Sequence, residues 1–92
     1  MPSFNLGDRI IQGVDLSGYD LSGLDLSGKE FINVDLSGAN LSGANLRDSI
    51  FRNVDLTGAD FQGANFSGAI LRGVIGLPVG SGLDGDPTID PD

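Results

Sequence analysis

The chain has 92 residues with 13 acidic against 5 basic side chains, a formal net charge of −8, and no cysteine, histidine or tryptophan. This length allows one small domain, and the lack of cysteine and histidine excludes a disulfide scaffold, thiolate or imidazole catalysis, and a soft-ligand zinc or iron–sulfur site. The excess of carboxylates argues against direct nucleic acid binding, because phosphates require positive charge. No apolar run approaches the roughly 20 residues that span a bilayer, and residues 1–3 begin no signal peptide, so we expect a cytoplasmic protein that does not bind membranes.

A five-residue repeat follows the short lead-in at residues 1–3 and continues from residue 4 to residue 73. The tetrad Asp-Leu-Ser-Gly stands in one frame at 15–18, 20–23, 25–28 and 35–38. A period of five fits neither the period of about 3.6 of a helix nor that of about 2 of a strand, so the backbone must turn once in every unit. Each of the fourteen units has a large apolar centre, which we predict to form the core: Leu6, Ile11, Leu16, Leu21, Leu26, Phe31, Leu36, Leu41, Leu46, Phe51, Leu56, Phe61, Phe66 and Leu71.

The last position of each unit indicates how the chain turns. Ten of the fourteen units end in glycine, and the others end in Asp8, Asn33, Asp48 and Asn53. These residue types tolerate a positive φ, so we predict a corner there. The residue before the centre is mostly Asp or Asn, whose side chains bond to nearby backbone amides in turns. We therefore interpret the aspartate columns as turn residues, not as a calcium site or an acid–base pair, and we assign no metal, cofactor or catalytic residue.

Units that depart from the repeat show how many corners complete one coil. The units centred on Ile11, Phe31, Phe51 and Leu71 lack Asp or Asn before the centre, and they lie twenty residues apart. The same spacing separates Val14, Val34, Val54 and Val74. Four units therefore make one square turn, and residues 4–73 make about three and a half turns, about 17 Å tall at a strand spacing of roughly 4.8 Å.

The repeat resembles that of the pentapeptide-repeat family, most closely at Ala39-Asn40-Leu41-Ser42-Gly43 and Ala59-Asp60-Phe61-Gln62-Gly63. The resemblance covers about three-quarters of the chain and implies an all-β fold, a right-handed quadrilateral parallel β-helix. In the inward slot where the family prefers alanine, this chain has Phe4, Arg9, Tyr19, Leu24 and Lys29. We expect the apolar three of these to cover the open N-terminal end and the two cations to extend outward.

The repeat stops after Gly73. Residues 74–79 keep apolar side chains but lose the frame, so we predict a short lid over the last coil. Residues 80–92 carry Asp84, Asp86, Asp90 and Asp92 with few large apolar groups, and we predict a disordered acidic tail or linker there.

One face of the predicted coil has isoleucine at outward positions. Ile10, Ile50 and Ile70 precede a centre and Ile32 follows one, whereas the repeat has polar residues or glycine there on the other faces. Exposed apolar groups on a small protein often mark a contact surface, so we predict that these four isoleucines bind a partner. Two alternatives stay open: isoleucine suits a strand, and the tail could fold back over this face.

Two main hypotheses of function follow. The first is a non-catalytic structural module that binds a protein of unknown identity, or a second copy of itself, through one face or by stacking of its ends into a homo-oligomer. The alternative, implied by the family resemblance, is an acidic DNA mimic that binds a type II topoisomerase such as DNA gyrase. A third, a stabilising module attached to a larger protein, is not separated from the first by the sequence.

The amount of charge favours the first hypothesis over mimicry. Duplex DNA carries one charge per roughly 1.7 Å of its axis, so a body about 17 Å tall would need about ten. Residues 1–79 contain nine acidic and five basic side chains, a net charge of −4.

Overall fold

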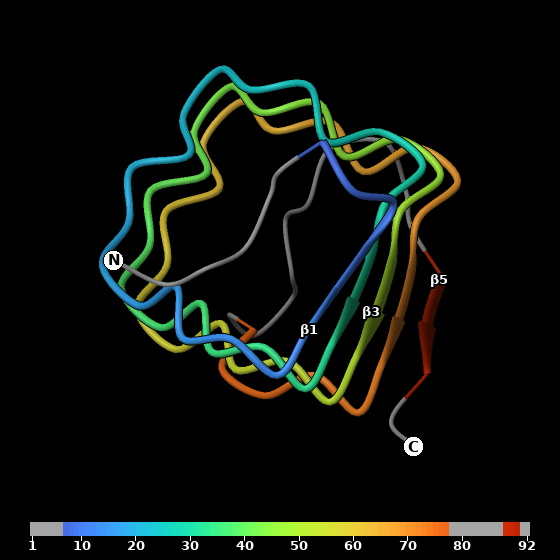
Figure 1. The fold of residues 1–92 in the computed structure, drawn as a ribbon. Coiled ribbons are helices and arrows are strands. Elements are labelled where there is room, and N and C mark those ends of the chain that lie inside the picture. Colours follow the sequence, from blue (N-terminus) through green and yellow to red (C-terminus); the bar gives the residue numbers. More distant parts are fainter. Residues whose placement is uncertain (1–6, 78–87, 91–92) are drawn as a thin grey trace.

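The computed structural model describes residues 7–77 and 88–90, which wind into stacked coils with all strands along one side (Figure 1). The strands are β1 (Ile10–Gln12), β2 (Glu30–Ile32), β3 (Ile50–Arg52), β4 (Ile70–Arg72) and β5 (Thr88–Asp90). They form one parallel sheet in the order β1-β2-β3-β4-β5. The described residues contain no helix long and apolar enough to cross a membrane.

The register of the ladder confirms four units per coil. Ile11 pairs with Phe31, and Phe31 pairs with Phe51, each a step of twenty residues. On the other three sides of the coil, single bridges repeat at the same step, as from Asp15 to Asp35. The fold is the predicted right-handed, four-sided parallel β-helix. We name the side formed by β1–β4 the sheet face and the following three sides, in chain order, the second, third and fourth faces.

A tight turn ends each unit on the second, third and fourth faces. The Tyr19 amide donates to the Leu16 carbonyl at 3.1 Å, and Gly18 between them has a φ of 71°, as in a type II turn. Asp15 supports this turn, because its Oδ1 accepts the Ser17 amide at 2.9 Å. Units of the sheet face have isoleucine or glutamate in place of that Asp, so the amide after the centre stays available to the ladder and three successive residues pair.

The predicted positive φ at the unit ends is confirmed at the ten glycines and at Asn33, Asp48 and Asn53, whose φ angles are 54°, 58° and 54°. The prediction is wrong for Asp8, which does not have a positive φ. The Glu30 amide donates to the carbonyl of Arg9, the residue after Asp8, at 2.8 Å. Among the described backbone bonds between coils none is made by Asp8 itself, unlike Gly13 and Gly18, whose amides donate to the next coil.

The apolar centres fill the inside of the coil. Twelve of them are at most 3% exposed: Ile11, Leu16, Leu21, Leu26, Phe31, Leu36, Leu41, Leu46, Phe51, Leu56, Phe66 and Leu71. Phe61, which we also expected in the core, is only half-buried and packs with its ring edge-on to Phe66, at 6.0 Å between ring centroids. Phe61 is the last member of its column within residues 7–77, and the centre of the first unit, Leu6, lies outside the described residues.

Bulky side chains occupy the inward slot near the N-terminal end. Tyr19 packs against the core, whereas Leu24 is 37% exposed; Phe4 lies outside the described residues. The turn bonds that follow Leu21 and Leu26 lengthen to 3.4 Å, compared with 3.0 Å where Ala39 fills the slot. The turn bond of Tyr19 stays at 3.1 Å, so the longer bonds do not follow the size of the side chain alone.

The two cations of this slot lie at the outside of the coil, as expected. Arg9 extends into solvent, with its side chain 78% exposed. The Lys29 Nζ donates to the Asp8 carbonyl at 3.1 Å.

The C-terminal end differs from the sequence-based expectation in two places. The ladder continues beyond Gly73, because the Leu56 amide donates to the Ile75 carbonyl at 2.9 Å. Gly76 then occupies the position of a centre and lies against the Thr57 backbone, and Leu77 packs on the core. Of the predicted lid, residues 78 and 79 lie outside the described part of the chain.

Strand β5 contradicts the expected disorder for residues 88–90 of the tail. It pairs in parallel with β4, with Ile89 in register with Leu71 and the Thr88 amide bonded to the Ala69 carbonyl at 2.9 Å. The edge of β4 offers unpaired backbone groups to any extended segment, so pairing there does not require the five-residue pattern. The rest of the predicted tail lies outside the described residues.

Candidate interaction surface

Two columns of side chains stand outward on the sheet face. The first column is Ile10, Glu30, Ile50 and Ile70, and the second is Gln12, Ile32, Arg52 and Arg72. Ile10 and Ile70 are 47% and 42% exposed, whereas Ile32 and Ile50 are half-buried. Burying exposed apolar surface in a complex releases free energy, so this face is a candidate for contact with a partner.

The structure brings two of the four predicted isoleucines into one groove. This groove, which we name the sheet groove, has a volume of about 270 Å³ and is lined by Glu30, Ile50, Arg52, Ile70 and Arg72. Ile10 and Ile32 lie on the same face but do not line it. Sequence reasoning did not select the two arginines and the glutamate, although the twenty-residue step places them in the same columns.

An ion pair orients the carboxylate at the β2 end of the sheet groove. Arg9 Nε lies 3.7 Å from Glu30 Oε2, and the Glu30 side chain is 23% exposed. Such a pair with an exposed partner contributes about 1 kcal/mol or less. Its consequence for the site is geometric, because it holds negative charge at the end of the groove away from β4.

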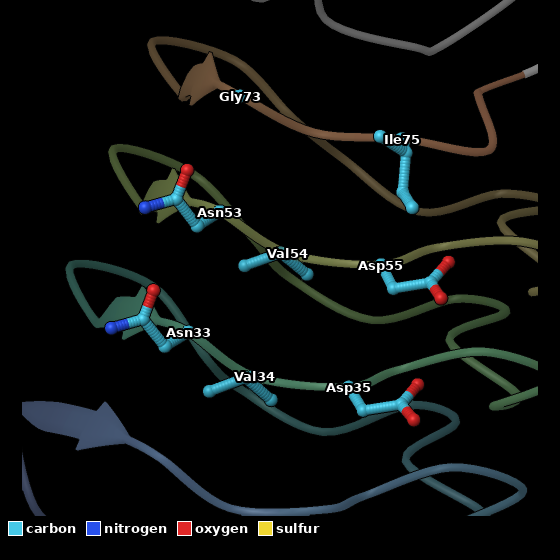
Figure 2. A pocket seen from close by; sticks show the side chains of 8 residues that line it. All are labelled: Asn33, Val34, Asp35, Asn53, Val54, Asp55, Gly73 and Ile75. Atoms are coloured by element: carbon cyan, nitrogen blue, oxygen red, sulfur yellow. The ribbon is translucent and has the colours of Figure 1, made fainter.

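A second groove of about 480 Å³ lies at the corner between the sheet face and the second face. Figure 2 shows the Asn33 and Asn53 side chains stacked along one side and those of Asp35 and Asp55 along the other. The remaining lining residues are Val34, Val54, Gly73 and Ile75. Sequence reasoning missed this groove, and its one signal is the replacement of glycine by asparagine at the same corner of two successive coils.

The aspartates before the centres are engaged in turns, as predicted. Asp15, Asp20, Asp25 and Asp35 each accept the amide and the hydroxyl of the serine two residues later, at 2.6 to 3.1 Å. Thr57 bonds to Asp55 in the same way. Both bonds lower the pKa of the aspartate at positions 15, 20, 25 and 55, and the bond from the hydroxyl has the larger effect. Within residues 7–77 and 88–90 no three acidic side chains are arranged to hold a metal ion.

Basic side chains are unevenly distributed over the four faces. The second and third faces, residues 14–23, 34–43 and 54–63, contain no lysine or arginine. Their carboxylates are Asp15, Asp20, Asp35, Asp55 and Asp60. Arg52 and Arg72 lie on the sheet face, so this side of an acidic molecule combines isoleucine with positive charge.

The chain matches the family model described as Pentapeptide repeats, with 8 copies over residues 10–48 and 35–73. The comparison with curated protein sequences gave no match.

Two solved structures show similarity over most of the chain. One is a pentapeptide repeat protein from the thylakoid lumen of Arabidopsis thaliana, with a TM-score of 0.69, 24% identity and coverage of 98% of this chain and 66% of that one. The other is QnrB1, a plasmid-mediated fluoroquinolone resistance protein, with a TM-score of 0.56, 30% identity and coverage of 71% of this chain and 41% of that one. The aligned part is thus just under two thirds of the first structure and about two fifths of the second.

Proposed function

Because the chain belongs to the pentapeptide-repeat family, whose members are generally structural or interaction modules, we propose that it is a non-catalytic module that binds a protein partner through the sheet face. The observation that carries this proposal is the sheet groove, where Ile50 and Ile70 lie beside Arg52 and Arg72. A second copy of the chain is one form that the partner could take.

A non-catalytic role is supported by the arrangement of the acidic side chains. General acid–base catalysis requires groups that converge on one bound substrate. The aspartates of the second and third faces instead repeat once per coil along the outside, and those at 15, 20, 35 and 55 accept hydrogen bonds from their own turns.

The proposal is tested by removing the apolar surface at constant charge. We expect the variant Ile10→Ser/Ile50→Ser/Ile70→Ser to lose a protein that the wild type retains in a pull-down, or to lose self-association in sedimentation. The control variant Asp20→Asn/Asp60→Asn keeps the turn acceptors and removes two charges, and it should bind like the wild type. Full binding by the isoleucine variant together with loss in the asparagine variant would contradict the proposal.

A second candidate function, an acidic DNA mimic that binds DNA gyrase, has specific support. The chain is 30% identical to a fluoroquinolone resistance protein over 71% of its length, and its second and third faces carry five carboxylates without a base. A mimic should inhibit gyrase supercoiling, most strongly at low salt, and the asparagine variant should inhibit less. The net charge of −4 on residues 1–79 ranks this candidate second.

A further inference from the structure

The sheet groove has two chemically different walls. Ile50 pairs with Ile70 across β3 and β4 on one side, and Arg52 pairs with Arg72 on the other. Between the walls the centres Phe51 and Leu71 point inward and are fully buried, so the floor is formed by strand backbone. The groove is lined from β2, β3 and β4, and it therefore follows the coil axis and crosses the strands.

From this geometry we propose that the sheet groove binds an acidic amphipathic α-helix of the partner protein, aligned with the coil axis. One row of the helix presents apolar side chains to Ile50 and Ile70, and the adjacent row presents carboxylates to Arg52 and Arg72. This inference rests on the proposed function and specifies the chemistry of the partner.

The spacing of the coils favours a helix over an extended segment. Three successive strands span about 9.6 Å at roughly 4.8 Å per step, and two turns of an α-helix span about 10.8 Å, a mismatch of about 1.2 Å. In an extended segment, side chains on one face repeat every roughly 6.6 Å, so two repeats span about 13.2 Å. This exceeds the span of three successive strands by about 3.6 Å. Rows of helical side chains three or four residues apart therefore stay aligned with the columns of the sheet face.

Charge selects both the sign of the partner and its place on the molecule. The whole chain has a net charge of −8, so its carboxylate-bearing second and third faces repel an acidic helix. Arg52 and Arg72 lie in neighbouring strands of one column and attract it at β3 and β4, and the basic part of the column ends at β5, where Asp90 is in register with Arg72. Complementary charge of this kind mainly steers association and fixes orientation, while the isoleucines supply the apolar contact.

Strand β2 limits the acidic row and sets the direction of the helix. In β2 the charged and the apolar side chain exchange columns. Glu30 lies in the column of Ile50, and Ile32 lies in the column of Arg52. A third turn of the partner helix that reaches β2 therefore requires a basic or neutral side chain opposite Glu30 and an apolar one opposite Ile32.

The test uses the whole chain and a fluorescein-labelled helical peptide of about 15 residues, with leucine and glutamate on adjacent rows spaced three or four apart and alanine elsewhere. We expect fluorescence anisotropy to show binding to the wild type. The variant Arg52→Glu/Arg72→Glu should bind this peptide at least about tenfold more weakly, because two attractive contacts become repulsive. It should bind a peptide with lysine in place of glutamate better than the wild type does.

The control is Arg47→Glu, which makes the same type of substitution at one exposed arginine on the fourth face and half the charge change of the double variant. This variant should bind within about twofold of the wild type, because the helix does not contact the fourth face. A second control peptide has the same composition with the two rows scrambled and should bind at least about tenfold more weakly. Circular dichroism checks that every variant keeps the fold.

Equal binding of the scrambled peptide, or an equal loss in the Arg47→Glu control, would overturn the inference, because binding would then depend on charge alone. One outcome is that the wild type binds no helical peptide while Ile10→Ser/Ile50→Ser/Ile70→Ser still loses its protein partner. In that case the inference of a helical partner is wrong and the proposed function stands. If the isoleucine variant also keeps its partner, the proposed function fails as well.

Discussion

At the scale of single residues, the fold depends on one turn repeated at every corner. Glycine, asparagine and aspartate could be predicted at positive φ because few other residues tolerate that backbone geometry. The failure at Asp8 shows the limit of such reasoning: residue type permits the geometry, but contact with an adjacent coil imposes it. The hydrogen bonds of the aspartates were predictable for the same reason, since their partners lie two residues away in the sequence.

Replacing Gly38 separates backbone strain from crowding. Gly38 has a φ of 67°, and a Cβ added there would meet no atom closer than 4.0 Å. We expect Gly38→Val to lower the free energy of unfolding by about 1–3 kcal/mol, because a β-branched residue is strained at positive φ. Gly38→Asn should cost clearly less, because asparagine already occupies this geometry at positions 33 and 53. Equal melting temperatures for the two variants would contradict the role of the corner.

The turn aspartates predict a loss of stability in acid. The folded state lowers the pKa of Asp15, Asp20, Asp25 and Asp55, so their contribution is complete above the pKa of the unfolded chain and is lost as pH falls through the lower folded values. The melting temperature should therefore decrease as the pH drops below about 4. Asp55→Asn keeps an acceptor for Thr57 and should make this decrease less steep. A melting temperature of the wild type that is constant down to pH about 2 would contradict this assignment.

At the scale of elements, the sequence predicted the columns better than the ends. The period and the valines define which residues stack, because each coil must place equivalent residues over one another. Strand β5 could not be predicted, since its pairing uses backbone groups of β4 and carries no repeat signal. The sheet groove is formed where side chains of both outward columns lie side by side on the same strands. The isoleucines alone did not indicate that the arginines line this groove as well.

A pair of neighbouring substitutions in β3 tests which side chains hold the coil together. Phe51 is fully buried and lies 4.9 Å from the Phe31 ring and 6.2 Å from the Phe66 ring, measured between centroids. Phe51→Ala should cost about 3–5 kcal/mol of unfolding free energy through the cavity it leaves. Arg52→Ala, one position further and exposed, should change it by no more than about 0.5 kcal/mol. Chemical denaturation with similar losses for both would contradict the assignment of inward and outward positions.

At the scale of the whole molecule, function depends on how the faces differ. Three faces follow the repeat closely and present turn residues, while the sheet face departs from it and presents isoleucine and arginine. The family and the regular faces account for the fold, and the departures from the repeat account for the candidate site. The identity of a partner is not encoded in the repeat, because a fold of this kind supports different functions through its surfaces.

Site-specific photo-crosslinking tests whether the sheet face is the surface that binds a partner. A photoreactive amino acid is placed in turn at Ile70 on the sheet face and at Asp60 on the third face, both exposed, in cells that express the chain. We expect a crosslinked protein, or a crosslinked second copy, from the Ile70 position and none from the Asp60 position. A crosslink to a protein from the Asp60 position alone would contradict binding through the sheet face and favour an acidic surface as the site of binding.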